Sequence, residues 1–251
     1  MGSSKYNEPV DFSTGDILSS RSCGDFEVID NSTSRNVSVK FIKTGTIVTK
    51  LQRGNVIRGN VHDHNYPTVE GKGYLGKPKS CVSSRSEAYV RWHGMLERCY
   101  SDKYHSIRGT YRDCEVCGGW LNFSVFEVWF DSNYREGYHL DKDLLYQGNR
   151  VYSPKTCCFI PPELNTLIVE KSRGDCGMGV SKRKKKGTQD YNGLYNVSFK
   201  GAYIGRFTDQ KVAEDRYREY KKLFFEEYAD IMEERLVITK EQASTLRRRK
   251  T

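Results

Sequence analysis

The chain has 251 residues, of which 37% are hydrophobic and 12% aromatic, with 41 Lys and Arg against 32 Asp and Glu. Nowhere does it hold the roughly 20 consecutive apolar residues of a membrane-spanning helix, and residues 1–14 lack the apolar core of a signal peptide. We therefore expect a cytoplasmic protein that is neither secreted nor bound to a membrane. Its eight cysteines are too sparse for a disulfide scaffold and are expected to be reduced, buried or metal-bound.

The excess of positive charge is concentrated in the last third of the chain. Residues 1–170 carry 21 basic and 20 acidic side chains, whereas residues 171–251 carry 20 basic and 12 acidic ones. A segment with this net positive charge should attract a polyanion, and nucleic acid is the commonest polyanion in a cytosol. A solvated basic surface without a partner is the alternative interpretation.

The first segment, residues 1–76, has the pattern of a small β unit. Between residues 26 and 69, short runs such as Val37, Val39 and Phe41 alternate with polar residues and are interrupted by glycines, which is typical of β-hairpins. The pattern does not indicate a role for this unit. Residues 71–86 are rich in Gly, Lys and Ser, and we expect them to form a linker.

The middle segment, residues 87–172, combines helical and extended patterns. Aromatic residues recur at helical spacing around Trp92 and around Phe126, which predicts two amphipathic helices whose aromatic stripes form a core. Extended runs at 138–145 and 157–160 then enclose a Gly-Asn loop, and Pro161 and Pro162 introduce a helix at about residue 163. The predicted order is strand, loop, strand, helix.

The last segment, residues 175–235, predicts a three-stranded antiparallel sheet followed by a helix. Tyr195, Val197 and Phe199 alternate with polar residues, and a Lys-Gly pair at residues 200 and 201 indicates a tight turn. An aromatic stripe in residues 213–228 should cover one face of this sheet and leave the other face open and basic. Residues 236–251 form a basic tail, and we expect its charge run at 247–250 to be disordered. The fold class is therefore α+β.

Three residues of the first extended run in the middle segment are candidates for chemistry. His139, Asp141 and Asp143 alternate, so their side chains should project to one face. An acid there and Asn165 on the next helix could supply oxygen ligands to Mg²⁺ or Mn²⁺, with His139 as the general base in phosphodiester hydrolysis. The other interpretation is a polar strand whose Asp and His cap a helix or pair with Lys142.

Two segments carry sets of residues with a recognisable order and spacing. In the middle segment these are Trp92, Met95, Arg98, Cys99, Tyr100, Cys117, Trp120, Leu140, Asp141, Lys142, Asp143, Gly148, Asn149, Tyr152, Ser153, Pro154, Cys157, Cys158, Phe159 and Asn165. In the last segment they are Gly179, Val180, Ser181, Tyr195, Asn196, Val197, Gly201, Ile204, Gly205, Arg206, Phe207, Ala213 and Tyr217. The first set resembles the phage-type HNH endonucleases. The second is similar to the ethylene-response-factor (AP2) type of DNA-binding domain, whose three strands enter the major groove.

The HNH resemblance implies a ββα-metal nuclease core within residues 87–172. Asp141 would match the metal-binding acid and Asn165 the helix residue that completes the metal site, and Asp143 is a further candidate ligand. Lys142 stands where the family has its histidine base, and Thr156 where it has the asparagine that orients this base.

This departure from the family pattern leaves proton transfer to His139 or to a metal-bound hydroxide. The catalytic candidates are thus His139, Lys142, Thr156 and the loop residue Asn149.

Cysteines and basic residues supply two further sets of candidates. Cys114 and Cys117 form half of a zinc knuckle, which Cys99 together with Cys157 or Cys158 could complete as a structural zinc site; buried reduced thiols are the alternative. In the AP2-like domain, which the resemblance places at residues 175–235, Lys182, Arg183, Lys184, Lys185 and Lys186 would contact phosphates, and Lys200 and Arg206 would reach bases.

These patterns favour a metal-dependent DNA endonuclease, a hydrolase of the HNH or homing type. It would bind double-stranded DNA through the C-terminal sheet and, if phage-encoded, act in the cytoplasm of the host cell. A DNA-binding protein with a degenerate nuclease core is the first alternative. A zinc-stabilised adaptor that binds a host protein through the N-terminal β unit is the second.

Overall fold

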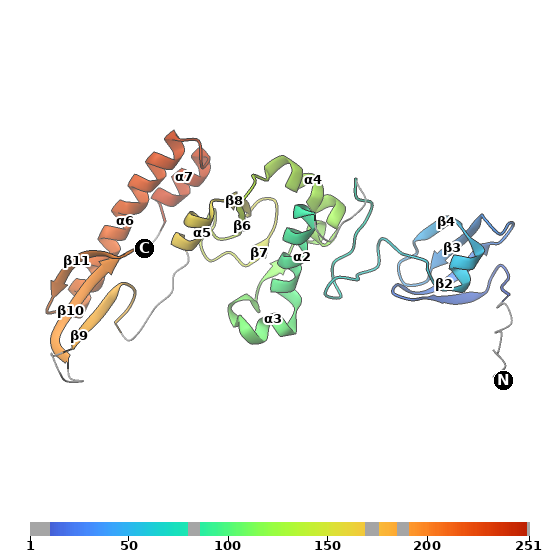
Figure 1. Cartoon of the computed structure of the whole chain (residues 1–251), viewed down its shortest axis with the longest axis horizontal. Coiled ribbons are helices and arrows are strands. Elements are labelled where there is room, and N and C mark those ends of the chain that lie inside the picture. The colour runs from blue at the N-terminus through green and yellow to red at the C-terminus, as the bar shows by residue number, and fades with distance from the viewer. Residues whose placement is uncertain (1–10, 80–85, 169–175, 185–190, 250–251) are drawn as a thin grey trace, which may run out of the picture. The chain divides into compact units, whose positions relative to one another are not determined.

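The computed structural model describes residues 11–79, 86–168, 176–184 and 191–249 (Figure 1). The chain divides into two compact units, residues 1–132 and 133–251. Both helices and sheets occur in the described ranges, so the α+β prediction is confirmed. None of the helices in these ranges combines the length and apolar character needed to cross a membrane.

The first unit begins with a four-stranded antiparallel sheet, as the hairpin pattern predicts. Its strands are β1 (Ile17–Ser20), β2 (Gly24–Asp30), β3 (Val37–Phe41) and β4 (Ile47–Leu51), paired in chain order and followed by α1 (Arg53–Ile57). Alternation buries one face, where the rings of Phe26 and Phe41 meet edge to face at 5.5 Å between centroids. Fully buried Val28 and Val39 extend this core along the same two strands.

The predicted linker at 71–86 is wrong for its described part, residues 71–79. The backbone N–H of Tyr74 donates to the Leu121 carbonyl at 2.9 Å, and the Phe123 N–H donates to the Tyr74 carbonyl at 2.9 Å. A Cβ added at Gly73 would stand 2.3 Å from Leu96 Cδ1, so glycine here permits close packing against a helix. Residues 80–85 lie outside the described ranges.

The rest of the first unit is a helical layer with an aromatic core. It contains α2 (Glu87–Tyr100), α3 (Asp102–Ile107), η1 (Gly109–Tyr111), β5 (Glu115–Val116), η2 (Gly118–Leu121) and α4 (Phe123–Asn133), of which the last residue belongs to the second unit. Ser86 caps α2 by accepting a hydrogen bond from the Tyr89 N–H. Trp92 is fully buried, and its Nε1–H donates to the Trp120 carbonyl at 2.7 Å. The aromatic stripes are therefore core, as predicted.

The second unit has the predicted order of strand, loop, strand and helix, with one further short strand, Val151–Tyr152, inside the predicted loop. We call residues 139–168 the β6–α5 segment: β6 (His139–Asp141), β7 (Val151–Tyr152), β8 (Cys158–Ile160) and α5 (Pro162–Ile168). β6 pairs with β8 in antiparallel fashion, with His139 opposite Ile160 and Asp141 opposite Cys158. Pro162 occupies the first position of α5, where its missing N–H costs nothing.

A three-stranded antiparallel sheet and two helices complete the second unit. The strands β9 (Val180–Lys184), β10 (Tyr191–Phe199) and β11 (Ala202–Phe207) lie in the order β11-β10-β9 and precede α6 (Gln210–Glu234) and α7 (Lys240–Arg247). Val180, Val197 and Ala213 are buried together, so α6 covers one face of the sheet as predicted.

Helix α6 belongs to two hydrophobic clusters. Beyond the sheet, Phe225 and Ala229 join Leu144, Ile160 and Leu164 of the β6–α5 segment and residues of α7 in a second core. Figure 1 shows α6 running from the sheet to α7. At 25 residues the helix is about 37 Å long, enough to serve both cores.

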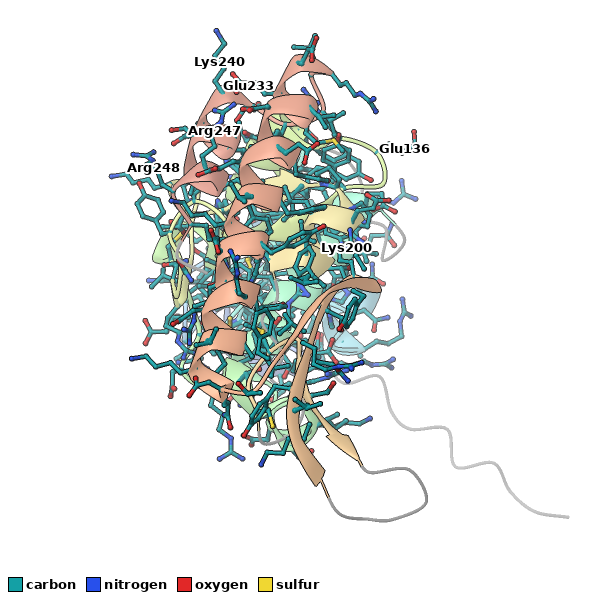
Figure 2. The ribbon with its side chains drawn as sticks, turned by 90° about the vertical axis from the view of Figure 1, so that its left-hand side faces the viewer. Glu136, Lys200, Glu233, Lys240, Arg247 and Arg248 are labelled. Carbon is teal, nitrogen blue, oxygen red and sulfur yellow. The ribbon has the colours of Figure 1, made fainter. Side chains whose placement is uncertain are left out.

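Residues 240–247 fold as α7, which a capping box between Thr239 and Gln242 begins. The prediction of disorder at 247–250 is wrong for its described part, because Arg247 ends this helix and the Arg249 guanidinium donates to the carbonyls of Asp143 and Ile168. Arg247 pairs with Asp230 and Glu233 of α6 at 2.7 and 2.6 Å, and Figure 2 shows Arg247 beside Glu233. Tertiary packing thus orders a segment whose charge alone predicts disorder.

Candidate functional site

Asp141 anchors a turn. Its Oδ1 accepts the backbone N–H of Asp143 at 2.9 Å and that of Leu144 at 2.6 Å, and the residue is only 8% exposed. Burial raises the pKa of the carboxyl group and outweighs the two N–H donors, which act in the opposite direction. β6 therefore ends at Asp141, and Asp143 lies in the turn rather than on the strand, contrary to the predicted alternation.

Lys142 and Asn149 shape the loop after β6. The Lys142 ammonium donates to Asp143 Oδ2 at 2.8 Å and to the Asn149 carbonyl at 2.7 Å, and the residue is 6% exposed. Asn149 Nδ2 donates to the carbonyls of Lys142 and Val151. Both side chains are thus engaged within the loop, which does not favour a proton-transfer role for either.

Thr156 also has a local structural role. Its hydroxyl donates to the Val151 carbonyl at 2.7 Å and lies 2.8 Å from the Ser153 hydroxyl. These hydrogen bonds close the turn before β8, so the Thr156 hydroxyl is engaged in the structure between β7 and β8.

His139 and Asn165 do meet. Asn165 Nδ2 lies 3.2 Å from His139 Nδ1, across the gap between β6 and α5. His139 is exposed and Asn165 half-buried, so a substrate can reach this pair. Among the predicted catalytic and metal-binding residues, this is the contact that joins the first strand to the helix.

The open face of the three-stranded sheet carries a second polar pair. Asn196 on β10 stands opposite Arg206 on β11, and Arg206 Nε donates to Asn196 Oδ1 at 3.2 Å. Arg206 is exposed, and its role in reading bases stays a prediction. The alternation of β10 places Asn196 on the open face, but the bulge between Val197 and Ser198 hides its pairing with Arg206 from sequence patterns.

The other predicted DNA contacts are placed differently. Lys182 stands opposite Tyr195, whose side chain packs in the sheet–helix core, so Lys182 belongs to the helix-covered side of the sheet. β9 extends to Lys184, so 182–184, including Arg183, is strand rather than loop. Lys185 and Lys186 lie outside the described residues.

Lys200 occupies the β10–β11 turn at the helix-covered side. Its Nζ stands 5.2 Å from the centroid of the Phe224 ring on α6. Figure 2 shows it at the end of the hairpin. It therefore does not lie on the open face with Arg206.

An open cleft of about 810 Å³ lies in the second unit, beside His139. We call it the Lys200 cleft. It is lined by His139, Glu163, Asn165, Thr166, Leu167, Met178, Gly179, Ser198, Phe199, Lys200 and Tyr217. The candidate pair His139–Asn165 and the β10–β11 turn thus open onto the same space.

Comparisons with protein-family models, with curated proteins and with solved structures gave no match.

The cysteines proposed as zinc ligands are divided between the two units. Cys99, Cys114 and Cys117 belong to the first unit, whereas Cys157 belongs to the second. Burial raises the pKa of the Cys157 thiol to about 12, so in this environment it is neutral at physiological pH. In the ranges that the structure describes, no three His, Cys, Asp or Glu side chains are grouped to hold one metal ion.

Proposed function

We propose that this protein is a metal-dependent DNA endonuclease of the HNH type, with a ββα core in the β6–α5 segment. The observation that carries the proposal is the His139–Asn165 contact, which joins the first strand to the helix at an accessible position. Such a pair can hold and activate a nucleophilic water beside a phosphodiester.

In this proposal His139 is the general base, through Nε2. A base at Nε2 requires that Nδ1 carry the ring proton and donate it to an acceptor. The Asn165 amide supplies this acceptor when its oxygen faces the ring, because rotation by half a turn exchanges the amide oxygen and nitrogen. Asn165 thereby takes the orienting role that the family resemblance gives to the position of Thr156.

The Asn165 side of this pair could hold a hard divalent cation. Mg²⁺ uses one or two protein oxygens and keeps most of its waters, so a dense cluster of ligands is not required. The candidate donor is the second lone pair of the Asn165 amide oxygen. Asp141 is committed to its turn, and Asp143 lies in the same turn, where its Oδ2 accepts a hydrogen bond from Lys142. When bound, such an ion would stabilise charge on the phosphate.

The DNA-binding part of the proposal rests on the open face of the sheet. Arg reads guanine and Asn reads adenine by paired hydrogen bonds, so Arg206 and Asn196 are suited to base edges in a major groove. Residues 176–209 carry seven basic and two acidic side chains, which would attract the phosphate backbone.

The test is cleavage of supercoiled plasmid in Mg²⁺ or Mn²⁺. We expect His139→Ala to slow nicking by at least about 100-fold, the usual contribution of a general base. Asn165→Ala should also slow it, whereas Asn165→Asp, which keeps an acceptor for Nδ1–H, should retain most of the activity. His64→Ala removes an exposed histidine of the first unit and serves as the control. If His139→Ala nicks as fast as wild type, the assignment is wrong.

A DNA-binding protein without cleavage is the second candidate. The hydrogen bonds of Lys142 and Asp141 within the loop favour this candidate. In the HNH family the position of Asp141 binds the metal and that of Lys142 holds the general base, and neither residue fills its role here. DNA binding without nicking under any divalent ion would select this candidate.

A further inference from the structure

The Lys200 cleft joins two parts of the second unit that the motifs assign to different roles. One wall, with His139 and Asn165, comes from the β6–α5 segment, and the other, with Ser198 and Lys200, comes from the β10–β11 hairpin. We infer that this cleft binds a phosphodiester group of duplex DNA, with Lys200 as its counter-charge. The inference rests on the proposed function, because it makes the sheet complete the site of His139.

The backbone at Lys200 is adapted to present this side chain. Lys200 and Gly201 have φ values of +49° and +86°, the left-handed conformation of a tight hairpin turn. This conformation costs a lysine roughly 1 kcal/mol and favours asparagine or glycine. Local turn preference therefore does not explain a lysine here.

Aromatic packing holds the turn beside α6. The Phe199 ring lies 5.1 Å from the Phe224 ring and 5.8 Å from the Tyr217 ring, measured between centroids. The Lys200 ammonium in turn lies over Phe224. A cation above an aromatic face keeps its charge while its alkyl stem is held in place.

The opposite wall of the cleft is fixed to the same helix. Leu164 and Ile168 of α5 are buried against Phe225 and Ala229, the former next in sequence to Phe224. One helix therefore sets the spacing between the Asn165 wall and the Lys200 wall.

The polar groups of the cleft suit an anion that also lies close to the proposed general base, His139. Besides Lys200, the side chains of Asn165 and Ser198 offer hydrogen-bond donors, whereas the Thr166 hydroxyl donates to the Pro162 carbonyl. Glu163 is the acidic residue among the lining side chains, and it lies in the first turn of α5, where the helix dipole favours a negative charge.

The test uses the full chain with Lys200→Asn, since asparagine suits the left-handed turn and the variant should fold. Lys200→Arg keeps the charge. The control is Lys211→Ala, which removes an exposed lysine of α6 outside the cleft. We measure nicking in Mn²⁺, duplex affinity against salt, and the NMR signals of the His139 ring, assigned with His139→Gln.

We expect duplex DNA to shift the His139 ring signals of the wild type. Lys200→Asn should remove this shift and slow nicking by about tenfold or more. It should also make the plot of log affinity against log salt less steep by about 0.9, the contribution of one phosphate contact. Lys200→Arg should restore the shift and the slope, and Lys211→Ala should change neither.

Two outcomes separate this inference from the proposed function. If the wild type never nicks DNA but shows a His139 shift that depends on Lys200, the endonuclease proposal fails and the phosphate site stands. If the shift is absent in the wild type, or Lys200→Asn leaves shift, slope and nicking unchanged, the inference is overturned.

Discussion

Asp141 shows how a residue that fits a catalytic motif can be committed to structure instead. Its carboxylate accepts hydrogen bonds from two backbone N–H groups inside the protein, a role that a neutral amide oxygen can also fill. Because burial raises the pKa of this carboxyl group, ionised Asp141 lowers the stability of the folded state.

We therefore predict that Asp141→Asn is at least as stable as the wild type at pH 7. The stability of the wild type falls as pH rises from the ordinary aspartate pKa, near 4, through the raised folded-state value, and this part of the fall should be missing in Asp141→Asn. Asp141→Ala should lose about 1–3 kcal/mol because two buried donors lose their acceptor.

Urea unfolding of all three proteins between pH 4 and 8 checks this prediction. A less stable Asp141→Asn at pH 7 would show that the charge itself is needed in the fold.

Sequence alone predicts the candidate site only in part. Alternation along β6 and the helix after Pro162 place His139 and Asn165 in the same segment, but their contact depends on how α5 packs on β6. Strand β6 ends at Asp141 because the Asp141 side chain accepts the backbone N–H of Asp143, and this bond competes with the hydrogen bonds of the β-ladder. The alternation of polar and apolar residues gives no sign of such a local bond.

At the scale of elements, α6 is the part on which the rest of the second unit depends. One end of it covers the sheet, and the other joins the core of the β6–α5 segment. The aromatic stripe predicts the helix and its sheet-facing side. It does not predict the second core, because the partners of Phe225 and Ala229 lie some 60 to 85 residues earlier in the chain or in α7.

We predict that Leu223→Pro disrupts both cores together. Leu223 is 59% exposed, so the main effect is on the helix backbone, and an interior proline costs about 3 kcal/mol or more. Hydrogen exchange should become faster in β6 and β8 and also in β10 and β11, while Leu223→Ala behaves like the wild type. Faster exchange in only one of the two pairs of strands would mean that α6 does not couple them.

At the scale of the whole molecule, the charge of the last third is divided between the segment with the strands and α6. Residues 176–209 are basic, whereas α6 carries five basic and eight acidic side chains. The positive charge that the sequence assigns to the last third thus resides on the strands and on the residues after α6. DNA is expected to approach the strands and to be repelled by the helix.

We predict that Arg206→Ala weakens binding to a preferred duplex by about 1–3 kcal/mol, as loss of a base contact does. Arg216→Ala removes an exposed arginine of α6 that is paired with Glu219, and it should leave the affinity nearly unchanged. Fluorescence anisotropy at two salt concentrations compares the DNA affinities of the variants. An equal loss of affinity in Arg206→Ala and Arg216→Ala would show that the open face of the sheet is not the DNA interface.

The packing of α7 has a consequence for the order of synthesis. Leu144 and Ile160 share a core with Ala243 and Leu246, and Gln242 Nε2 donates to the Phe159 carbonyl at 3.1 Å. A ribosome delivers the β6–α5 segment first, then the sheet, and α7 only afterwards. The segment that holds His139 therefore cannot complete its core in a growing chain until the strands of the sheet proposed to bind DNA have been synthesised.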